Sequence, residues 1–91
     1  MKNIRVLVVD DSAFMRKIIS DMLSSHEGIE VVDTARDGRW AIEKLKSTGV
    51  DVVTMDVEMP RMDGLEALSI ISGTYKVPVI MLSSLTNRGT D

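Results

Sequence analysis

The sequence predicts an α/β fold in which a mostly parallel sheet carries helices on both faces. Two observations predict it. Short apolar runs rich in β-branched residues alternate along the chain with segments whose apolar residues recur at helical spacing. The connections between these segments are short, so consecutive elements should be neighbours joined by right-handed crossovers. The expected order is β-α-β-α-β-α-β.

The chain begins with a strand and a helix. Residues 4–9 form an apolar, β-branched run that ends at Asp10 and Asp11, which predicts a buried strand. Ser12 is a typical N-cap, and the helix after it should end near residue 25. The helix is predicted to be amphipathic because apolar residues recur at helical spacing. These residues are Phe14, Met15, Ile18, Ile19, Met22 and Leu23.

A second strand and helix follow. Residues 30–35 are more polar than the first run, as expected of a strand at a sheet edge, and Asp37-Gly38 breaks the strand. Residues 40–46 place apolar side chains on one side and charged ones on the other, and residues 47–49 stop this helix.

The central strand is predicted at residues 51–56, where residues that suit a buried pleated surface lie between two aspartates. Pro60 ends the segment because proline cannot continue a ladder. Asp63 can cap a third helix that closes near residues 73–74, and a fourth strand follows at 79–82.

Length and composition narrow the class of protein. Ninety-one residues fit one domain, and no segment approaches the roughly 18 uninterrupted apolar residues of a membrane span. The chain has no cysteine, one histidine and a net charge of −3, so a structural zinc site and a broadly basic nucleic-acid surface are not expected. We expect a cytoplasmic protein that binds neither nucleic acid nor membrane and whose partner is a protein or a small anion.

The predicted sheet brings three aspartates together. In the flavodoxin-like doubly wound order 2-1-3-4, strands 1 and 3 are neighbours, and ligands bind at their carboxyl ends. Asp10 and Asp11 follow strand 1, and Asp56 ends strand 3. Convergent carboxylates repel one another, and Mg²⁺ compensates by taking carboxylate oxygens while leaving positions for phosphate. A carboxylate can also be the nucleophile in phosphoryl transfer, for which Asp56 is the best candidate.

Four motifs in this order resemble the receiver domains of two-component response regulators. They are Val8-Val9-Asp10-Asp11-Ser12, Met55-Asp56-Val57-Glu58-Met59-Pro60, Met62-Asp63-Gly64 and Met81-Leu82-Ser83-Ser84. Within that family, residues 10–16 and 83–86 are similar to those of the chemotaxis protein-glutamate methylesterases.

The resemblance implies a set of roles. Asp56 would accept a phosphoryl group from a phosphohistidine on a histidine kinase, and Asp10 and Asp11 would bind Mg²⁺ with it. The backbone carbonyl of Glu58 would be a further metal ligand, and Ser83 would be the switch hydroxyl that bonds the phosphoryl group. The pocket would be shaped by Ser12, Met59, Pro60, Asp63 and Gly64.

The sequence departs from the family pattern at its carboxyl end. Receivers have a fifth strand, whose terminal lysine contacts the phosphoryl group, and a fifth helix, whereas this sequence stops at Asp91. Lys76 is no substitute because it precedes strand 4, at the opposite end of the sheet. We therefore expect residues 1–91 to form a truncated receiver, with no methylesterase catalytic domain. Strand 4 becomes an open edge, a sheet face around Val6, Val8 and Val53 is exposed, and self-association follows.

Three other functions fit parts of the pattern. A haloacid-dehalogenase-like phosphatase uses a strand-end aspartate but needs a second one two residues later, where this chain has Glu58. A flavodoxin-like flavin binder needs a hydroxyl- and glycine-rich phosphate loop where Asp10 and Asp11 stand. The third alternative is a non-catalytic interaction or assembly fragment that retains an unused acidic pocket.

Overall fold

The computed structural model describes residues 2–56 and 64–82. Its elements are β1 (Ile4–Val9), α1 (Ala13–Ser24), β2 (Ile29–Ala35), α2 (Gly38–Ser47), β3 (Val52–Asp56), α3 (Gly64–Ile70), a π-helical turn η1 (Ile71–Tyr75) and β4 (Val79–Leu82). Within this part of the chain the strands form one parallel sheet in the order β2-β1-β3-β4. The predicted α/β fold and strand order are confirmed.

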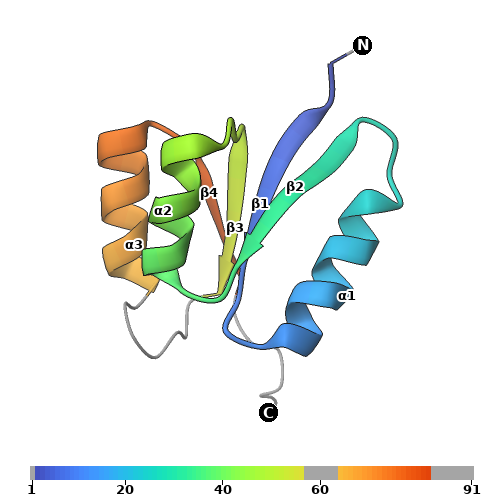
Figure 1. Ribbon diagram of the computed structural model, residues 1–91, viewed down its shortest axis with the longest axis horizontal. Coiled ribbons are helices and arrows are strands. Elements are labelled where there is room, and N and C mark those ends of the chain that lie inside the picture. The colour runs from blue at the N-terminus through green and yellow to red at the C-terminus, as the bar shows by residue number, and fades with distance from the viewer. Residues whose placement is uncertain (1, 57–63, 83–91) are drawn as a thin grey trace.

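The helices divide unequally between the two faces of the sheet. Figure 1 shows α1 alone on one face and α2 and α3 side by side on the other. None of the helices in the described ranges is long and apolar enough to cross a bilayer.

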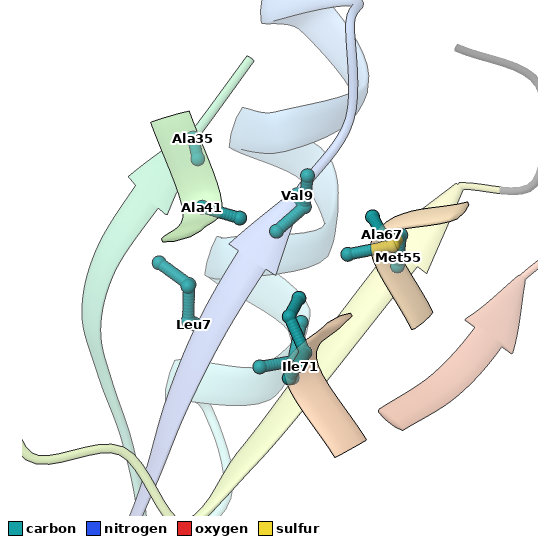
Figure 2. Close-up of a cluster of buried hydrophobic side chains, with 8 residues drawn as sticks. Leu7, Val9, Ala35, Ala41, Met55, Ala67 and Ile71 are labelled. Carbon is teal, nitrogen blue, oxygen red and sulfur yellow. The ribbon is translucent and has the colours of Figure 1, made fainter. Parts of the chain in front are cut away.

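The larger core lies under α2 and α3. Leu7 and Val9 of β1 alternate onto this face with Val53 and Met55 of β3, because successive side chains of a strand point to opposite faces. They pack against three helical side chains, and Figure 2 shows most of this cluster. The helical members are Ala41, Ala67 and Ile71.

The smaller core lies under α1. It consists of Val6 and Val8 from β1 and Ile19 from the helix, with half-buried Leu23, Val52 and other apolar side chains around them. The predicted opening around Val6, Val8 and Val53 is therefore wrong. Val6 and Val8 are 3% and 0% exposed because α1 covers β1, and Val53 is fully buried on the opposite face.

The apolar surface that remains exposed lies instead on the outer side of α1 and at the sheet edge. Phe14, Ile18 and Met22 are 72%, 41% and 55% exposed, and Ile80 of β4 is 52% exposed. A single helix packs on this face, so only its sheet-facing line of side chains is covered. Ile19 is the one apolar residue of α1 that is fully buried.

Both long helices begin at side-chain caps. The hydroxyl of Ser12 accepts a hydrogen bond from the Met15 N–H at 3.2 Å, as the sequence predicts. The carboxylate of Asp37 accepts one from the Trp40 N–H at 3.0 Å. Asp37 therefore starts α2, whereas the sequence interpretation treated it only as the end of a strand.

Two substitutions in α1 test which of its apolar residues supports the fold. We expect Ile19→Val to lower the free energy of unfolding by about 1 kcal/mol, because it removes a buried methylene group. Phe14→Leu should change it by less than about 0.5 kcal/mol, because Phe14 is largely exposed. Urea unfolding measures both values, and equal effects would contradict the assignment of the inner face.

Candidate metal centre

The acidic residues singled out in the sequence meet at one edge of the sheet. Asp10 directly follows β1, and Asp56 is the last residue of β3. These strands pair in parallel, with Val9 opposite Met55, so their carboxyl ends lie side by side. Asp11 follows Asp10 in the turn that leads into α1.

The three carboxylates are close enough to share one cation. Asp10, Asp11 and Asp56 each offer an oxygen, and these oxygens lie within 4.8 Å of one another. In octahedral Mg²⁺ coordination, oxygens sit about 2.1 Å from the ion, so opposite ligands are about 4.2 Å apart. The oxygen donor set and its spacing therefore fit Mg²⁺ after small side-chain rotations.

The three side chains differ in their contact with water. Asp10 is buried at 6% exposure, Asp56 is half-buried and Asp11 is exposed. Asp10 is therefore the least accessible of the three, and Asp11 is the one most open to solvent.

Asp10 is fixed by three hydrogen bonds. Its Oδ1 accepts from the Ser12 N–H at 2.9 Å, and its own N–H donates to the Ala35 carbonyl at 3.0 Å. Its carbonyl oxygen accepts from Nη1 of Arg16 at 2.7 Å. Backbone and side chain are therefore both held in place before any cation arrives, which lowers the entropic cost of binding one.

The ionised form of Asp10 is disfavoured in the folded chain. Burial raises the pKa of Asp10 above its ordinary value, and the nearby Asp56 and Asp11 carboxylates raise it further. The Ser12 N–H and the Arg16 guanidinium act in the opposite direction without cancelling the shift. A cation bound by the three carboxylates would offset their mutual repulsion. The raised pKa of Asp10 and the spacing of the carboxylate oxygens therefore point to the same kind of ligand.

Several residues assigned from the sequence lie outside the described residues. These are Glu58, Met59, Pro60, Asp63 and Ser83, and their roles stay predictions. Gly64 is the first residue of α3. Ser12 lies at the centre through its backbone N–H on Asp10, in addition to capping α1.

Arg16 is a residue at this centre that the sequence interpretation did not identify. Its position in α1 appeared to belong to the outer, polar side of the helix. The guanidinium instead reaches back over the first turn to the Asp10 carbonyl, six residues earlier in the chain. The only signal in the sequence is a long cationic side chain one turn after an acidic pair.

Comparison with known proteins identifies the family of this chain. The model of the response regulator receiver domain matches residues 6–90. The chain belongs to this family. A protein-glutamate methylesterase/protein-glutamine glutaminase of Geobacillus kaustophilus is 59% identical to it over 91 residues, which is all of this chain and 26% of that protein. This receiver chain thus spans about a quarter of the length of the curated relatives it matches.

Solved structures of receivers are similar to the whole described fold. The response regulator domain of Thermotoga maritima CheB superimposes with a TM-score of 0.86 at 49% identity, covering 98% of this receiver and 66% of that chain. A chain of the CheX-CheY-BeF3-Mg+2 complex from Borrelia burgdorferi superimposes with a TM-score of 0.83 at 41% identity. The match covers 96% of this receiver and 66% of that chain. The chain is thus a receiver of the CheB type in sequence and in fold.

Removing the charge of Asp10 tests the electrostatic description. In the absence of Mg²⁺ and near neutral pH, we expect Asp10→Asn to raise the free energy of unfolding by about 1 kcal/mol, because one repulsive carboxylate is removed while an oxygen remains for the Ser12 N–H. Urea unfolding in a metal chelator measures this difference.

The difference between Asp10→Asn and the wild type should depend on pH. A raised pKa in the folded state means that the stability linked to Asp10 is fully present below its ordinary pKa of 3.8 and is lost as the pH rises through the raised value. The advantage of Asp10→Asn should therefore shrink as the pH falls toward 3.8. A difference that stays constant with pH contradicts a charge effect.

Proposed function

We propose that this receiver is an Mg²⁺-dependent phosphoacceptor in which Asp56 takes a phosphoryl group from a phosphohistidine of a histidine kinase. The observation that carries the proposal is the meeting of three carboxylate oxygens within 4.8 Å at the carboxyl edge of β1 and β3. Such a cluster is unfavourable by itself and becomes favourable with a cation that also binds phosphate oxygens.

Asp56 is the nucleophile in this proposal because of its place in the sheet. It ends β3, which is paired on both sides, by β1 and by β4, so its backbone is held in a central strand of the sheet. It is half-buried, which leaves its carboxylate open to an incoming donor. Asp10 is buried and already accepts from the Ser12 N–H, so it suits metal binding better than attack.

The reaction conserves atoms and charge without a further co-reactant. A carboxylate oxygen of Asp56 forms a bond to phosphorus, and the bond between phosphorus and the histidine nitrogen breaks. Its electron pair stays on the ring, which carries a proton on its other nitrogen and therefore leaves as neutral imidazole. Asp10 and Asp11 would hold the ion, and Mg²⁺, when bound, supplies positive charge to phosphoryl oxygens. The Arg16 hydrogen bond keeps the Asp10 backbone in place meanwhile.

The finer assignments form part of the same proposal. The Glu58 carbonyl completes the metal ligands, Ser83 is the switch hydroxyl, and Met59, Pro60, Asp63 and Gly64 shape the pocket. Residues 1–91 act as one receiver unit in chemotaxis signalling in the cytoplasm. Similarity to the methylesterases supports the chemotaxis assignment, because the identity extends over the full chain.

Phosphorylation is tested by measuring intact mass after incubation with acetyl phosphate and Mg²⁺. We expect the wild-type chain to gain one phosphoryl group and Asp56→Asn to gain none, because the amide is not a nucleophile. Leaving out Mg²⁺, or using Asp11→Asn, should reduce the yield by at least about tenfold, since charge neutralisation is lost. An adduct on Asp56→Asn, or one independent of Mg²⁺, would overturn the proposal.

A second candidate function is self-association through the outer side of α1 and the edge strand β4. The observation in its favour is the exposed apolar surface of Phe14, Ile18, Met22 and Ile80, the last of these on strand β4 at one edge of the sheet formed by the described residues. Apolar surface of this kind is commonly covered by another chain.

Sedimentation velocity over a wide range of protein concentrations tests self-association. We expect the sedimentation coefficient to rise with concentration, and Phe14→Ser with Ile80→Ser to abolish the rise, because these exposed side chains contribute little to the fold of one chain. A stable monomer at every concentration would contradict this function while leaving phosphorylation untouched.

A further inference from the structure

A hollow lined by arginine and tryptophan side chains lies beside the acidic edge. A cavity of about 320 Å³ is bordered by Arg36, Arg39 and Trp40, together with Asp37 and Glu43. A second cavity of about 190 Å³ shares Arg36 and Trp40 with the first and extends to Arg16. We call the hollow defined by Arg36, Arg39 and Trp40 the Trp40 pocket.

The acidic side chains at this hollow are already engaged. The Asp37 carboxylate caps α2 by accepting from the Trp40 N–H. Glu43 is paired with Lys46 at 3.1 Å. In the smaller cavity, Lys44 is likewise paired, with Asp33 at 3.0 Å. These acidic groups therefore contact partners other than Arg36 and Arg39, and they keep their negative charges.

The two arginines of the pocket present their guanidinium groups to solvent. The Arg36 guanidinium stacks over the Trp40 ring, 5.2 Å from its centroid, and this contact leaves the N–H groups of its edge available. Within residues 2–56 and 64–82, neither Arg36 nor Arg39 has an ion-pair partner, and both are exposed. The pocket therefore combines two exposed guanidinium groups with an aromatic ring that is 44% exposed.

This combination fits a peptide that carries carboxylates beside an apolar side chain. Guanidinium groups bind carboxylates through paired hydrogen bonds, and an exposed indole ring covers apolar side chains. Tryptophan and arginine are also the residue types that contribute most binding energy at protein interfaces. A cavity of about 320 Å³ lies at the small end of ligand sites, which suits one or two side chains of a docked segment.

We propose that the Trp40 pocket docks an acidic segment of a partner protein, with carboxylates on Arg36 and Arg39 and an apolar side chain against Trp40. The partner would then lie next to the acidic edge, because Arg16 borders the smaller cavity and also donates to the Asp10 carbonyl. This inference does not rest on phosphorylation of Asp56. It concerns only where a partner protein binds next to the acidic edge of the sheet.

Long-range electrostatics do not favour an acidic partner, because the chain has a net charge of −3. The attraction is therefore local, within a few ångströms of the two guanidinium groups. Such contacts are weakened by salt when they remain solvent-exposed. Docking through the pocket should accordingly lose affinity as the ionic strength rises.

The test uses the folded 91-residue chain and the peptide acetyl-ELEE-amide, with acetyl-QLQQ-amide as the neutral control. Trp40 is the only tryptophan in the sequence, so tryptophan fluorescence reports on the pocket alone. We expect the acidic peptide to change the fluorescence saturably, with weaker binding at higher salt, and the neutral peptide to cause no saturable change.

Substitutions then locate the binding. Arg36→Gln and Arg39→Gln should each weaken the affinity for acetyl-ELEE-amide by about fivefold or more. Lys17→Gln removes the same charge from an exposed side chain of α1 and should leave the affinity within about twofold. Calorimetry gives these affinities because Arg36→Gln itself alters the surroundings of the indole, and circular dichroism verifies that each variant is folded.

Three outcomes would overturn the assignment. If the neutral peptide binds as tightly as the acidic one, the pocket binds the apolar side chain and does not recognise the carboxylates. Equal losses in Lys17→Gln and the arginine variants would show non-specific attraction. Tighter binding of adenosine monophosphate than of the acidic peptide would show a nucleotide site. Peptide binding is measured without a phosphodonor, and phosphorylation of Asp56 is measured without a peptide. Failure of one proposal can therefore be distinguished from failure of the other.

Discussion

Repulsion among the carboxylates at the ends of β1 and β3 is the constraint on which the site depends. The parallel pairing of these strands brings Asp10 and Asp56 to one edge whatever their charges, and Asp11 follows in the adjoining turn. The fold gains nothing from this proximity, since burial and like charge both raise the pKa of Asp10. A bound cation, as proposed for this centre, would supply the counter-charge that the arrangement lacks.

The surroundings of Asp10 show how the fold holds this unfavourable group. Hydrogen bonds from the Ser12 N–H and from Arg16, and one donated to the Ala35 carbonyl, involve β1, β2 and α1 at once. Each of them fixes position without removing the negative charge. The position of the Asp10 carboxylate is therefore fixed, and its repulsion from Asp11 and Asp56 is left for a bound cation to offset.

The two faces of the sheet contribute differently. The face under α2 and α3 holds a continuous apolar core that includes Leu7, Met55 and Ile71, and it supports the strands that carry the site. The face under α1 is covered only along one line, and Phe14 and Ile80 remain exposed. The first face therefore supports the strands that carry the site, and the second leaves apolar side chains exposed to solvent.

Opposite charges lie close together at the carboxyl edge. The acidic cluster suits a cation and a phosphoryl group, and the neighbouring Trp40 pocket presents two guanidinium groups without ion-pair partners among the described residues. Arg16 donates to the Asp10 carbonyl and also borders the smaller cavity next to the Trp40 pocket. A protein partner that offers acidic side chains beside its reacting group would match both regions at once.

The sequence by itself determined the alternation of strands and helices, their parallel order and the convergence of Asp10, Asp11 and Asp56. Local periodicity and the carboxyl-end rule for parallel sheets suffice for these. Tertiary structure alone decided which apolar side chains are covered, that Arg16 folds back onto Asp10, and that Arg36 stacks on Trp40. The physical reason is that strand periodicity fixes which residues share a face, whereas burial and side-chain contacts depend on which elements pack against that face.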